Sequence, residues 1–195
     1  MQNKLAGKRI AILVADGFEQ VEMTEPRKAL ENAGARTDLI SPAKPKVQAA
    51  KHHDKGDTFP VDVPLDLAQP GDYDALLLPG GVANPDQLRT IPKAVHFVRS
   101  FFDRHKPVAA ICHAPWMLVE ANVVQGRNVT SWPSLQTDLR NAGAKWTDQP
   151  AVIDNGLVTS RKPDDIPAFN DAMIEVFSKA PEREVEPAGI SRGRY

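Results

Sequence analysis

The stretch KPVAAICHAP, residues 106–115, carries the strongest signal for the fold. Residues 106–111 are a short apolar run, which is typical of a strand buried on both faces of a sheet. Cys112 follows directly, and a helix is expected to begin just after it. Ala110 and Ala114 stand two residues to either side of Cys112, where a tight strand-to-helix turn requires small side chains because backbone packs against backbone. We therefore predict a nucleophile elbow that carries Cys112 at the end of a buried strand.

Segments on both sides of this stretch alternate between two patterns. Short apolar runs typical of strands occur at residues 9–14, 35–40 and 73–78. Amphipathic stretches typical of helices occur at residues 21–33, 91–104, 117–121, 132–141 and 163–177. In AVIDNGLVTS, residues 151–160, Asn-Gly joins two apolar runs and predicts a hairpin. This alternation indicates an α/β fold around a mostly parallel sheet, which binds ligands at the carboxyl ends of its strands.

Length and composition exclude several classes of protein. The 195 residues fit one domain, expected over residues 1–180, with a charged tail over residues 181–195. Residues 42–60 are polar and are expected to form an exposed loop or hairpin. The hydrophobic share of 42% argues against a disordered chain, and the net charge of −1 against nucleic-acid or membrane-surface binding. No run approaches the length of a membrane span.

The chain contains one cysteine, so it has neither an intrachain disulfide framework nor an all-cysteine zinc site. A lone thiol fits a reducing compartment, and we expect a cytoplasmic protein. On the elbow, Cys112 would sit near a helix N-terminus, whose partial positive charge favours the thiolate. The alternative is that Cys112 is simply a small buried residue, as most lone cysteines are. The elbow context favours a nucleophile.

Other candidate residues lie near the ends of the expected strands. His113 is either a base for Cys112 or a helix-cap or surface histidine, and one Cys-His pair lacks the ligands of a zinc site, so we expect no metal and no cofactor. Gly80-Gly81 follows a strand, and its backbone N–H groups would either stabilise an oxyanion or form a plain turn. Glu19 and Glu22 would share a helix face. Asp86, after the Gly-Gly loop, is explained equally well as a helix cap.

Four motifs occur together, in order and with consistent spacing: GFEQVE (17–22), LLLPGG (76–81), AAICHAP (109–115) and VTSRKPDD (158–165). In this set the chain resembles the PfpI-type intracellular proteases, whose superfamily includes the Parkinson-associated deglycase and the class I glutamine amidotransferases. The resemblance runs from about residue 9 to residue 177. It implies a flavodoxin-like three-layer α/β sandwich with a nucleophile elbow.

The resemblance also implies roles for single residues. Cys112 corresponds to the reactive cysteine, and Glu22 to the carboxyl group that hydrogen-bonds the thiol. Such a carboxylate raises a thiol pKa by charge repulsion, so the pair is expected to share a proton. His113 corresponds to the family histidine. Its backbone N–H and Gly81 correspond to the oxyanion donors.

Three further positions follow from the same resemblance. Gly80 and Arg161 are expected at the pocket. Asp86 corresponds to an acidic residue that, in the protease branch, reaches the histidine of a neighbouring subunit, although Asp86 is one methylene shorter than the usual glutamate. Because that site crosses an interface, we expect a homodimer or a hexamer of dimers.

The resemblance leaves three functions open. The first is a cysteine-dependent stress-response hydrolase, either an intracellular peptidase or a deglycase or glyoxalase-like enzyme that acts on a small carbonyl compound. The second is a non-enzymatic protein in which oxidation of Cys112 senses or absorbs oxidants. The third, a glutamine amidotransferase domain, is least favoured because the chain has no synthetase partner domain and no late His-x-Glu pair.

Overall fold

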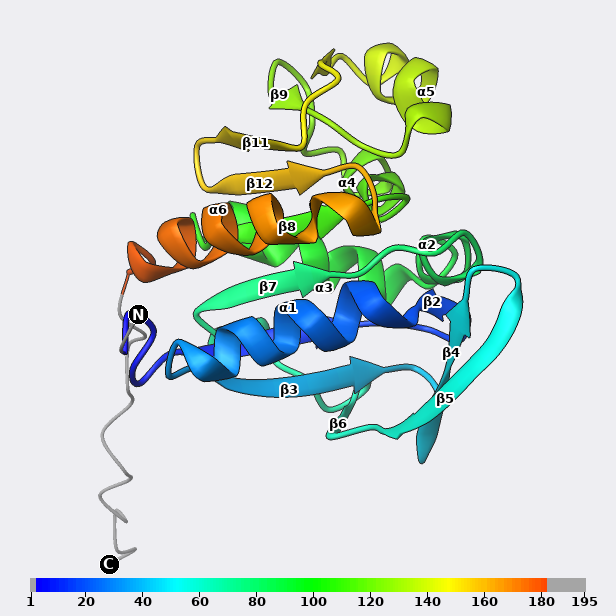
Figure 1. Ribbon diagram of the computed structural model, residues 1–195, viewed down its shortest axis with the longest axis vertical. Coiled ribbons are helices and arrows are strands. Elements are labelled where there is room, and N and C mark those ends of the chain that lie inside the picture. The colour runs from blue at the N-terminus through cyan, green and yellow to red at the C-terminus, as the bar shows by residue number, and fades with distance from the viewer. Residues whose placement is uncertain (1–2, 182–195) are drawn as a thin grey trace, which may run out of the picture.

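The computed structural model describes residues 3–181. A seven-stranded sheet with the order β11-β12-β8-β7-β1-β3-β6 forms its centre (Figure 1). All neighbouring strands are parallel except β11 and β12. The strands are β1 (Arg9–Leu13), β3 (Arg36–Ser41), β6 (Val63–Pro64), β7 (Ala75–Leu78), β8 (Val108–Ile111), β11 (Ala151–Asp154) and β12 (Leu157–Ser160). The predicted α/β fold with a mostly parallel sheet is therefore confirmed.

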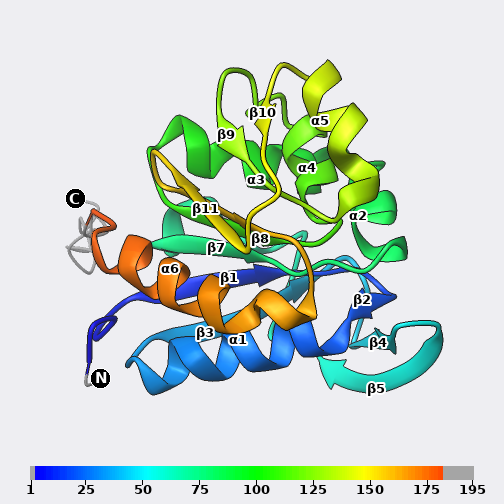
Figure 2. The ribbon, with the colours of Figure 1, turned by 45° about the horizontal axis from the view of Figure 1, so that its top comes forward.

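Helices cover both faces of this sheet, which gives three layers (Figure 2). One face is covered by α1 (Gln20–Asn32) and α6 (Ile166–Ser178). The opposite side carries α2 (Ala83–Leu88), α3 (Pro92–Asp103), α4 (Pro115–Glu120) and α5 (Gln136–Asn141). Single turns of 3-10 helix occur at η1 (Pro70–Asp72), η2 (Pro133–Leu135) and η3 (Pro163–Asp165). The short helix α2 was not predicted from the sequence, because NPDQL shows no apolar periodicity.

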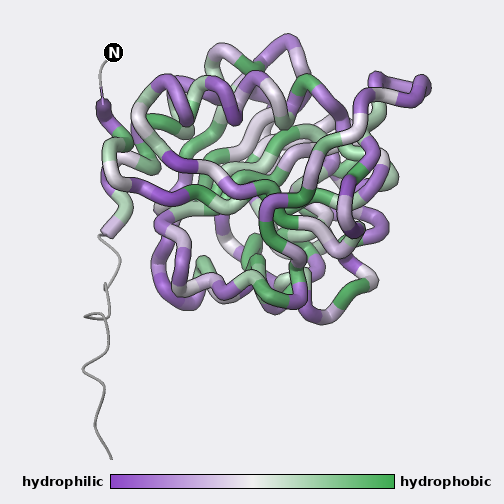
Figure 3. The backbone as a smooth tube through the Cα atoms, turned by 90° about the horizontal axis from the view of Figure 1, so that it is seen from below, coloured by the Kyte–Doolittle hydropathy of each residue, from purple (hydrophilic) through white to green (hydrophobic). Residues whose placement is uncertain are grey.

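The sheet separates two hydrophobic cores. Along β1, Ile10 and Ile12 pack toward α1 and α6, whereas Ala11 and Leu13 pack toward α3 and α4. This alternation follows from the two-residue period of a strand, and it requires apolar side chains on both faces. Figure 3 shows the apolar segments concentrated inside and the hydrophilic ones in the outer loops. The apolar runs that predicted the strands are therefore the interior of the protein.

Two small sheets flank the central one. The hairpin expected within residues 42–60 is β4 (Lys46–Lys51) and β5 (Asp54–Pro60), and β4 also pairs with β2 (Phe18–Glu19). The second small sheet joins β9 (Asn128–Val129) to β10 (Lys145–Trp146). The Asn155-Gly156 hairpin is confirmed as the turn between β11 and β12.

No helix within residues 3–181 is long and apolar enough to cross a membrane. The expected tail begins at residue 181, and its residues 182–195 lie outside the described part of the chain.

Candidate active site

Cys112 stands on a sharp turn directly after β8, with a backbone φ of 64°. Residues other than glycine rarely adopt positive φ, and the strain is of order 1 kcal/mol or more. Neighbouring segments hold the turn in place: the Cys112 N–H donates to the Ser160 carbonyl (3.0 Å), and its carbonyl accepts from Trp132 N–H (2.9 Å). The predicted strained turn at the carboxyl end of a buried strand is confirmed.

The glycines after β7 lie directly against this turn. A Cβ on Gly80 would lie 2.6 Å from the Cβ of Cys112 and 2.5 Å from Glu22 Oε2, so no other residue fits there without displacement. Gly81 has a φ of 83°, which a glycine adopts without strain. The Asn84 side chain donates to the carbonyls of Pro79 and Gly80, which fixes the loop. The close approach predicted for Gly80-Gly81 brings their N–H groups to the site.

Glu22 comes from the first turn of α1 and is completely buried. Its Oε2 accepts a hydrogen bond from the Gly80 N–H (2.9 Å), while Oε1 has no partner among the described residues. Burial raises the pKa of the Glu22 carboxyl to about 8. Glu22 is therefore mostly protonated at neutral pH, which removes most of its charge repulsion with the adjacent thiol.

The thiol of Cys112 is buried next to this carboxyl, and its side chain forms a short contact with the following residue. Burial and the Glu22 charge raise the thiol pKa, whereas the backbone N–H groups of Gly81 and His113 lower it. The sequence predicts that a helix N-terminus favours the thiolate, but burial is the largest effect and raises the thiol pKa instead. Sγ lies 3.2 Å from His113 Nδ1. Glu22 and Cys112 shift each other's pKa. The hydrogen bond of the sulfur, however, is with Nδ1 of His113.

His113 packs against two indole rings. Its ring centroid lies 5.7 Å from that of Trp132 in a stacked arrangement and 5.4 Å from that of Trp116. Burial lowers the pKa of His113, so its imidazole is neutral at pH 7 and can accept a proton. These contacts restrict the ring whose Nδ1 lies 3.2 Å from the sulfur.

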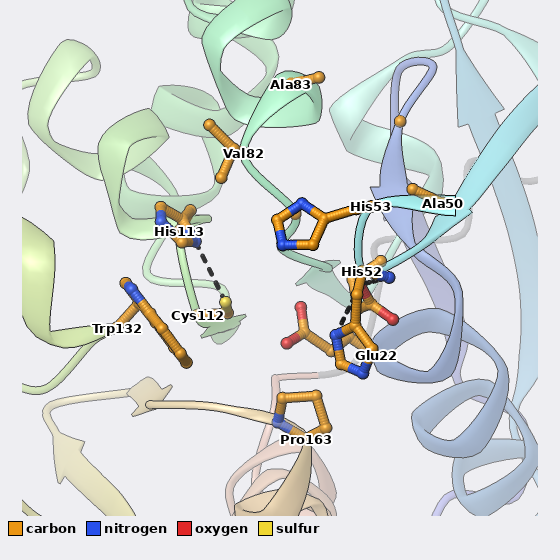
Figure 4. A pocket seen from close by; sticks show the side chains of 13 residues that line it. Glu22, Ala50, His52, His53, Val82, Ala83, Cys112, His113, Trp132 and Pro163 are labelled. Atoms are coloured by element: carbon orange, nitrogen blue, oxygen red, sulfur yellow. Dashed lines mark hydrogen bonds and ion pairs between the residues drawn. The ribbon is translucent and has the colours of Figure 1, made fainter. Parts of the chain in front are cut away.

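A cavity of about 620 Å³ opens above these groups (Figure 4). We call Glu22, Cys112 and His113 the floor of the cavity, because all three are buried. We call His52, His53, Val82 and Trp132, four of the exposed lining residues, its rim. The remaining lining residues are Gly17, Glu19, Ala50, Gly81, Ala83 and Pro163.

The rim contains residues to which the sequence assigned no role. His52 and His53 form the turn between β4 and β5. The pairing of Phe18 with Ala49 carries that turn to the cavity, where the His52 N–H donates to Glu19 Oε2 (2.9 Å). No local signal in the sequence indicates this, because the pairing joins segments about 30 residues apart. Trp132 had been assigned only to a helix start.

Three of the predicted site residues, two assigned to the pocket and one to a triad across an interface, do not line the cavity. Gly80 lies behind the floor, where its N–H bonds to Glu22. Arg161 instead forms ion pairs with Asp148 and Asp165, both at 2.8 Å. Asp86 lies exposed in the first turn of α2 and is absent from the lining. Arg161 belongs to the junction of β12 and α6 and does not line the cavity, so its predicted role at the pocket stays a prediction.

Within the described residues, no cluster of three or more histidine, cysteine or acidic side chains could hold a metal ion. A thiol, a neutral imidazole and two backbone N–H donors converge at the bottom of an open cavity. Such a set can add sulfur to a carbonyl carbon and stabilise the oxyanion that forms.

Comparison with known proteins agrees with this arrangement. Residues 8–176 match the model of the DJ-1/PfpI family. The chain belongs to the DJ-1/PfpI family. It is 42% identical over 174 residues to General stress protein 18 of Bacillus subtilis, covering 89% of this chain and 99% of that protein. It is 40% identical over 170 residues to another Bacillus subtilis protein, named "Putative cysteine protease YraA", covering 87% and 98%.

A solved structure shows the same family fold. A two-domain protein of Anabaena variabilis, with DJ-1/ThiJ/PfpI-like and ferritin-like domains, matches with a TM-score of 0.82 and 29% identity. The match covers 93% of this chain and 52% of that one. The flavodoxin-like sandwich implied by the sequence motifs is therefore confirmed, and its elbow carries the candidate nucleophile.

Proposed function

We propose that this chain is a cysteine-dependent stress-response enzyme that acts on aldehyde or acyl carbonyl groups through Cys112. The observation that carries the proposal is the contact of 3.2 Å between Cys112 Sγ and Nδ1 of His113 at the floor of an open cavity. A thiol with a raised pKa needs a base, and a buried neutral imidazole provides one. The names of two relatives, a general stress protein and a cysteine protease, are consistent with it.

The first chemical step follows from this geometry. His113 Nδ1 takes the thiol proton while the sulfur lone pair forms a C–S bond to the carbonyl carbon. The π electrons of the C=O bond move to oxygen, where the N–H groups of Gly81 and His113 stabilise the charge. With an aldehyde, return of the proton from His113 to that oxygen gives a neutral thiohemiacetal. With an acyl group, loss of the leaving group gives a thioester that water hydrolyses.

An aldehyde fits the chain on its own better than a peptide does. A peptidase requires a base that also protonates an amine leaving group, and a carboxylate usually orients that histidine. In the part of the chain that the structure describes, His113 has no carboxylate partner, and Asp86 is exposed on α2. We favour a glyoxalase or deglycase-like reaction, with peptidase activity as the alternative that a neighbouring subunit's Asp86 would complete.

The test compares wild type with Cys112→Ser on methylglyoxal and on fluorogenic peptides, with His105→Asn as the control for a histidine away from the cavity. We expect turnover of the aldehyde by wild type and the control, and its loss in Cys112→Ser. Turnover that survives in Cys112→Ser would refute the proposal. If wild type turned over neither substrate while hydrogen peroxide added two oxygen atoms to Cys112, the alternative oxidant-sensing function would replace it.

We also propose that the protein is cytoplasmic and assembles as a homodimer or a larger homo-oligomer. The support is its lone thiol and the exposed position of Asp86, which leaves that carboxylate accessible to a second copy. Analytical ultracentrifugation at micromolar concentration is the test of assembly, and a monomer there would contradict it. Fractionation of the cells that produce the protein tests its location.

A further inference from the structure

The cavity above Cys112 is much larger than the smallest aldehydes require. Its volume is about 620 Å³, within the range of roughly 300–1,000 Å³ that is typical of sites for drug-sized ligands. Methylglyoxal has the bulk of only a few water molecules, each about 30 Å³. When bound to Cys112 it would leave most of the rim without contacts.

The rim also exposes large apolar side chains. Val82 is 57% exposed and Trp132 is 38% exposed, and they are two of the four large apolar side chains that the described residues expose. Ala83 and Pro163 extend the same apolar lining. Such a concentration beside a reactive thiol is informative, since isolated exposed apolar residues are ordinary whereas clusters mark binding sites.

Trp132 is held in place. Its backbone N–H donates to the Cys112 carbonyl, and its indole ring stacks on His113 with an interplanar angle of 23°. Figure 4 shows the indole beside the sulfur, with the hairpin residues His52 and His53 across the cavity. A flat, fixed aromatic surface next to the nucleophile provides a contact for an aromatic ring at little entropic cost.

Charge narrows the class of ligand further. The lining contains two carboxyl groups, Glu19 and Glu22, and no lysine or arginine. Arg161 is the one arginine in the four sequence motifs, and it forms ion pairs with Asp148 and Asp165. At neutral pH an anionic ligand would therefore meet the Glu19 carboxylate beside a mostly protonated Glu22, and no lysine or arginine, which disfavours it.

We propose that the cavity selects neutral carbonyl compounds that carry an aryl or similarly bulky apolar substituent, bound against Val82 and Trp132 while Cys112 attacks the carbonyl carbon. This inference rests on the proposed function and specifies its substrate class. It assigns the floor to chemistry and Val82 and Trp132 of the rim to selection.

The kinetic test compares phenylglyoxal with methylglyoxal by the ratio of their kcat/KM values. We expect wild type to favour phenylglyoxal at least tenfold, because pocket contacts of this size typically discriminate by 10–200-fold. Val82→Ser should reduce the ratio several-fold, and Trp132→Phe should retain more of it than Trp132→Ala. Ile153→Ser removes an equally exposed apolar side chain outside the cavity and should leave the ratio unchanged. Equal ratios in wild type, Val82→Ser and Ile153→Ser would overturn the inference while the proposed function stands.

A binding test separates the inference from catalysis. Cys112→Ser protein is titrated with benzamide, acetamide and benzoate and followed by ligand-observed NMR. We expect benzamide to bind at least tenfold more tightly than either of the others. If benzamide bound no better than acetamide or benzoate, the inference would fail even if the enzyme were active. If wild type turned over neither glyoxal, preferential binding of benzamide would preserve the selection while the proposed function failed.

Sedimentation of Val82→Ser distinguishes a substrate surface from a contact between copies of the chain. We expect its sedimentation coefficient to equal that of wild type. A smaller assembly in Val82→Ser, with the substrate ratio unchanged, would identify the exposed valine as part of a subunit interface and overturn the inference.

Discussion

The floor and the rim of the cavity are built in opposite ways. Glu22, Cys112 and His113 are buried and come from α1 and from the elbow after β8. His52, His53, Val82 and Trp132 are exposed and come from loops. The Glu22 and Cys112 groups at the floor alter each other's pKa, whereas the rim side chains are open to solvent. Substitutions at the floor should therefore change stability and chemistry together, and substitution of Val82 at the rim should change selection alone. Trp132 belongs to the rim but also packs on His113, so its substitution should affect both.

The largest expected effect is that of Glu22→Gln on the pH dependence of stability. Burial raises the folded-state pKa of Glu22 from 4.5 to about 8, so the folded protein holds this proton more tightly than the unfolded chain. Its contribution is fully present below pH 4.5 and is lost as the pH rises through about 8. Between about pH 5 and pH 8, wild type should lose about 3 kcal/mol more unfolding free energy than Glu22→Gln. Urea denaturation at several pH values measures this difference.

Glu19→Gln is the matched control, three residues earlier on the chain. Glu19 accepts a hydrogen bond from the His52 N–H at the edge of the cavity, and its substitution should leave the pH dependence close to that of wild type.

Glu22→Gln should also lower the pKa of Cys112, because it removes a charge that raises it, and should speed alkylation by iodoacetamide at alkaline pH. An alkylation profile identical to that of wild type would show that Glu22 and the thiol are not coupled.

Gly80→Ala tests whether the floor is packed as tightly as the distances indicate. The added Cβ would meet Glu22, Cys112 and the Ile111 carbonyl at 2.5–2.8 Å, and overpacking of this kind costs about 2–3 kcal/mol. Gly126→Ala is the control, since Gly126 has a φ of 77° and open space around it. That variant should lose about 1 kcal/mol from backbone strain.

The alkylation rate of Cys112 distinguishes Gly80→Ala from Gly126→Ala independently of their stabilities. Gly80→Ala should change the alkylation rate of Cys112 severalfold, because the new methyl group presses on the cysteine itself. Gly126→Ala should leave the rate unchanged. Equal alkylation rates in the two variants would mean that the loop after β7 can move away from the elbow.

The floor could be predicted from the sequence because local backbone rules place its parts. A buried strand followed by small residues predicts the elbow at Cys112, and a buried strand followed by Gly80-Gly81 predicts the adjacent loop. Both strands run in the same direction in one sheet, so their ends meet. Glu22 could not be chosen over Glu19 from the residues alone, since both are compatible with a solvated first turn of the helix that the sequence predicts. The resemblance to the family supplied that choice.

The rim could not be predicted because long-range contacts place it. His52 and His53 reach the cavity because β4 pairs with β2. Trp132 reaches it through a hydrogen bond from its backbone N–H to the Cys112 carbonyl. Nothing in the polar stretch 42–60 or in the Trp-Pro pair at 132–133 indicates either contact. The same limit applies to Arg161, whose motif lies in the expected order along the chain but whose side chain forms ion pairs with Asp148 and Asp165.

Arg161→Gln has the smallest expected effect and tests the boundary of the site. The guanidinium donates two hydrogen bonds to the buried Asp165 (2.8 and 2.9 Å) and one to Asp148 (2.8 Å), which ties the end of β12 to the start of α6. Partly exposed ion pairs of this kind contribute about 1 kcal/mol, and we expect that loss in urea denaturation. Arg99→Gln, which breaks an exposed ion pair of 4.0 Å with Asp103, should lose less unfolding free energy.

Because Arg161 is absent from the cavity lining, kcat/KM and the alkylation rate of Cys112 in Arg161→Gln should match wild type. A fall of tenfold or more in kcat/KM with unchanged stability would place Arg161 in contact with substrate, and the site would then extend beyond the floor and the rim.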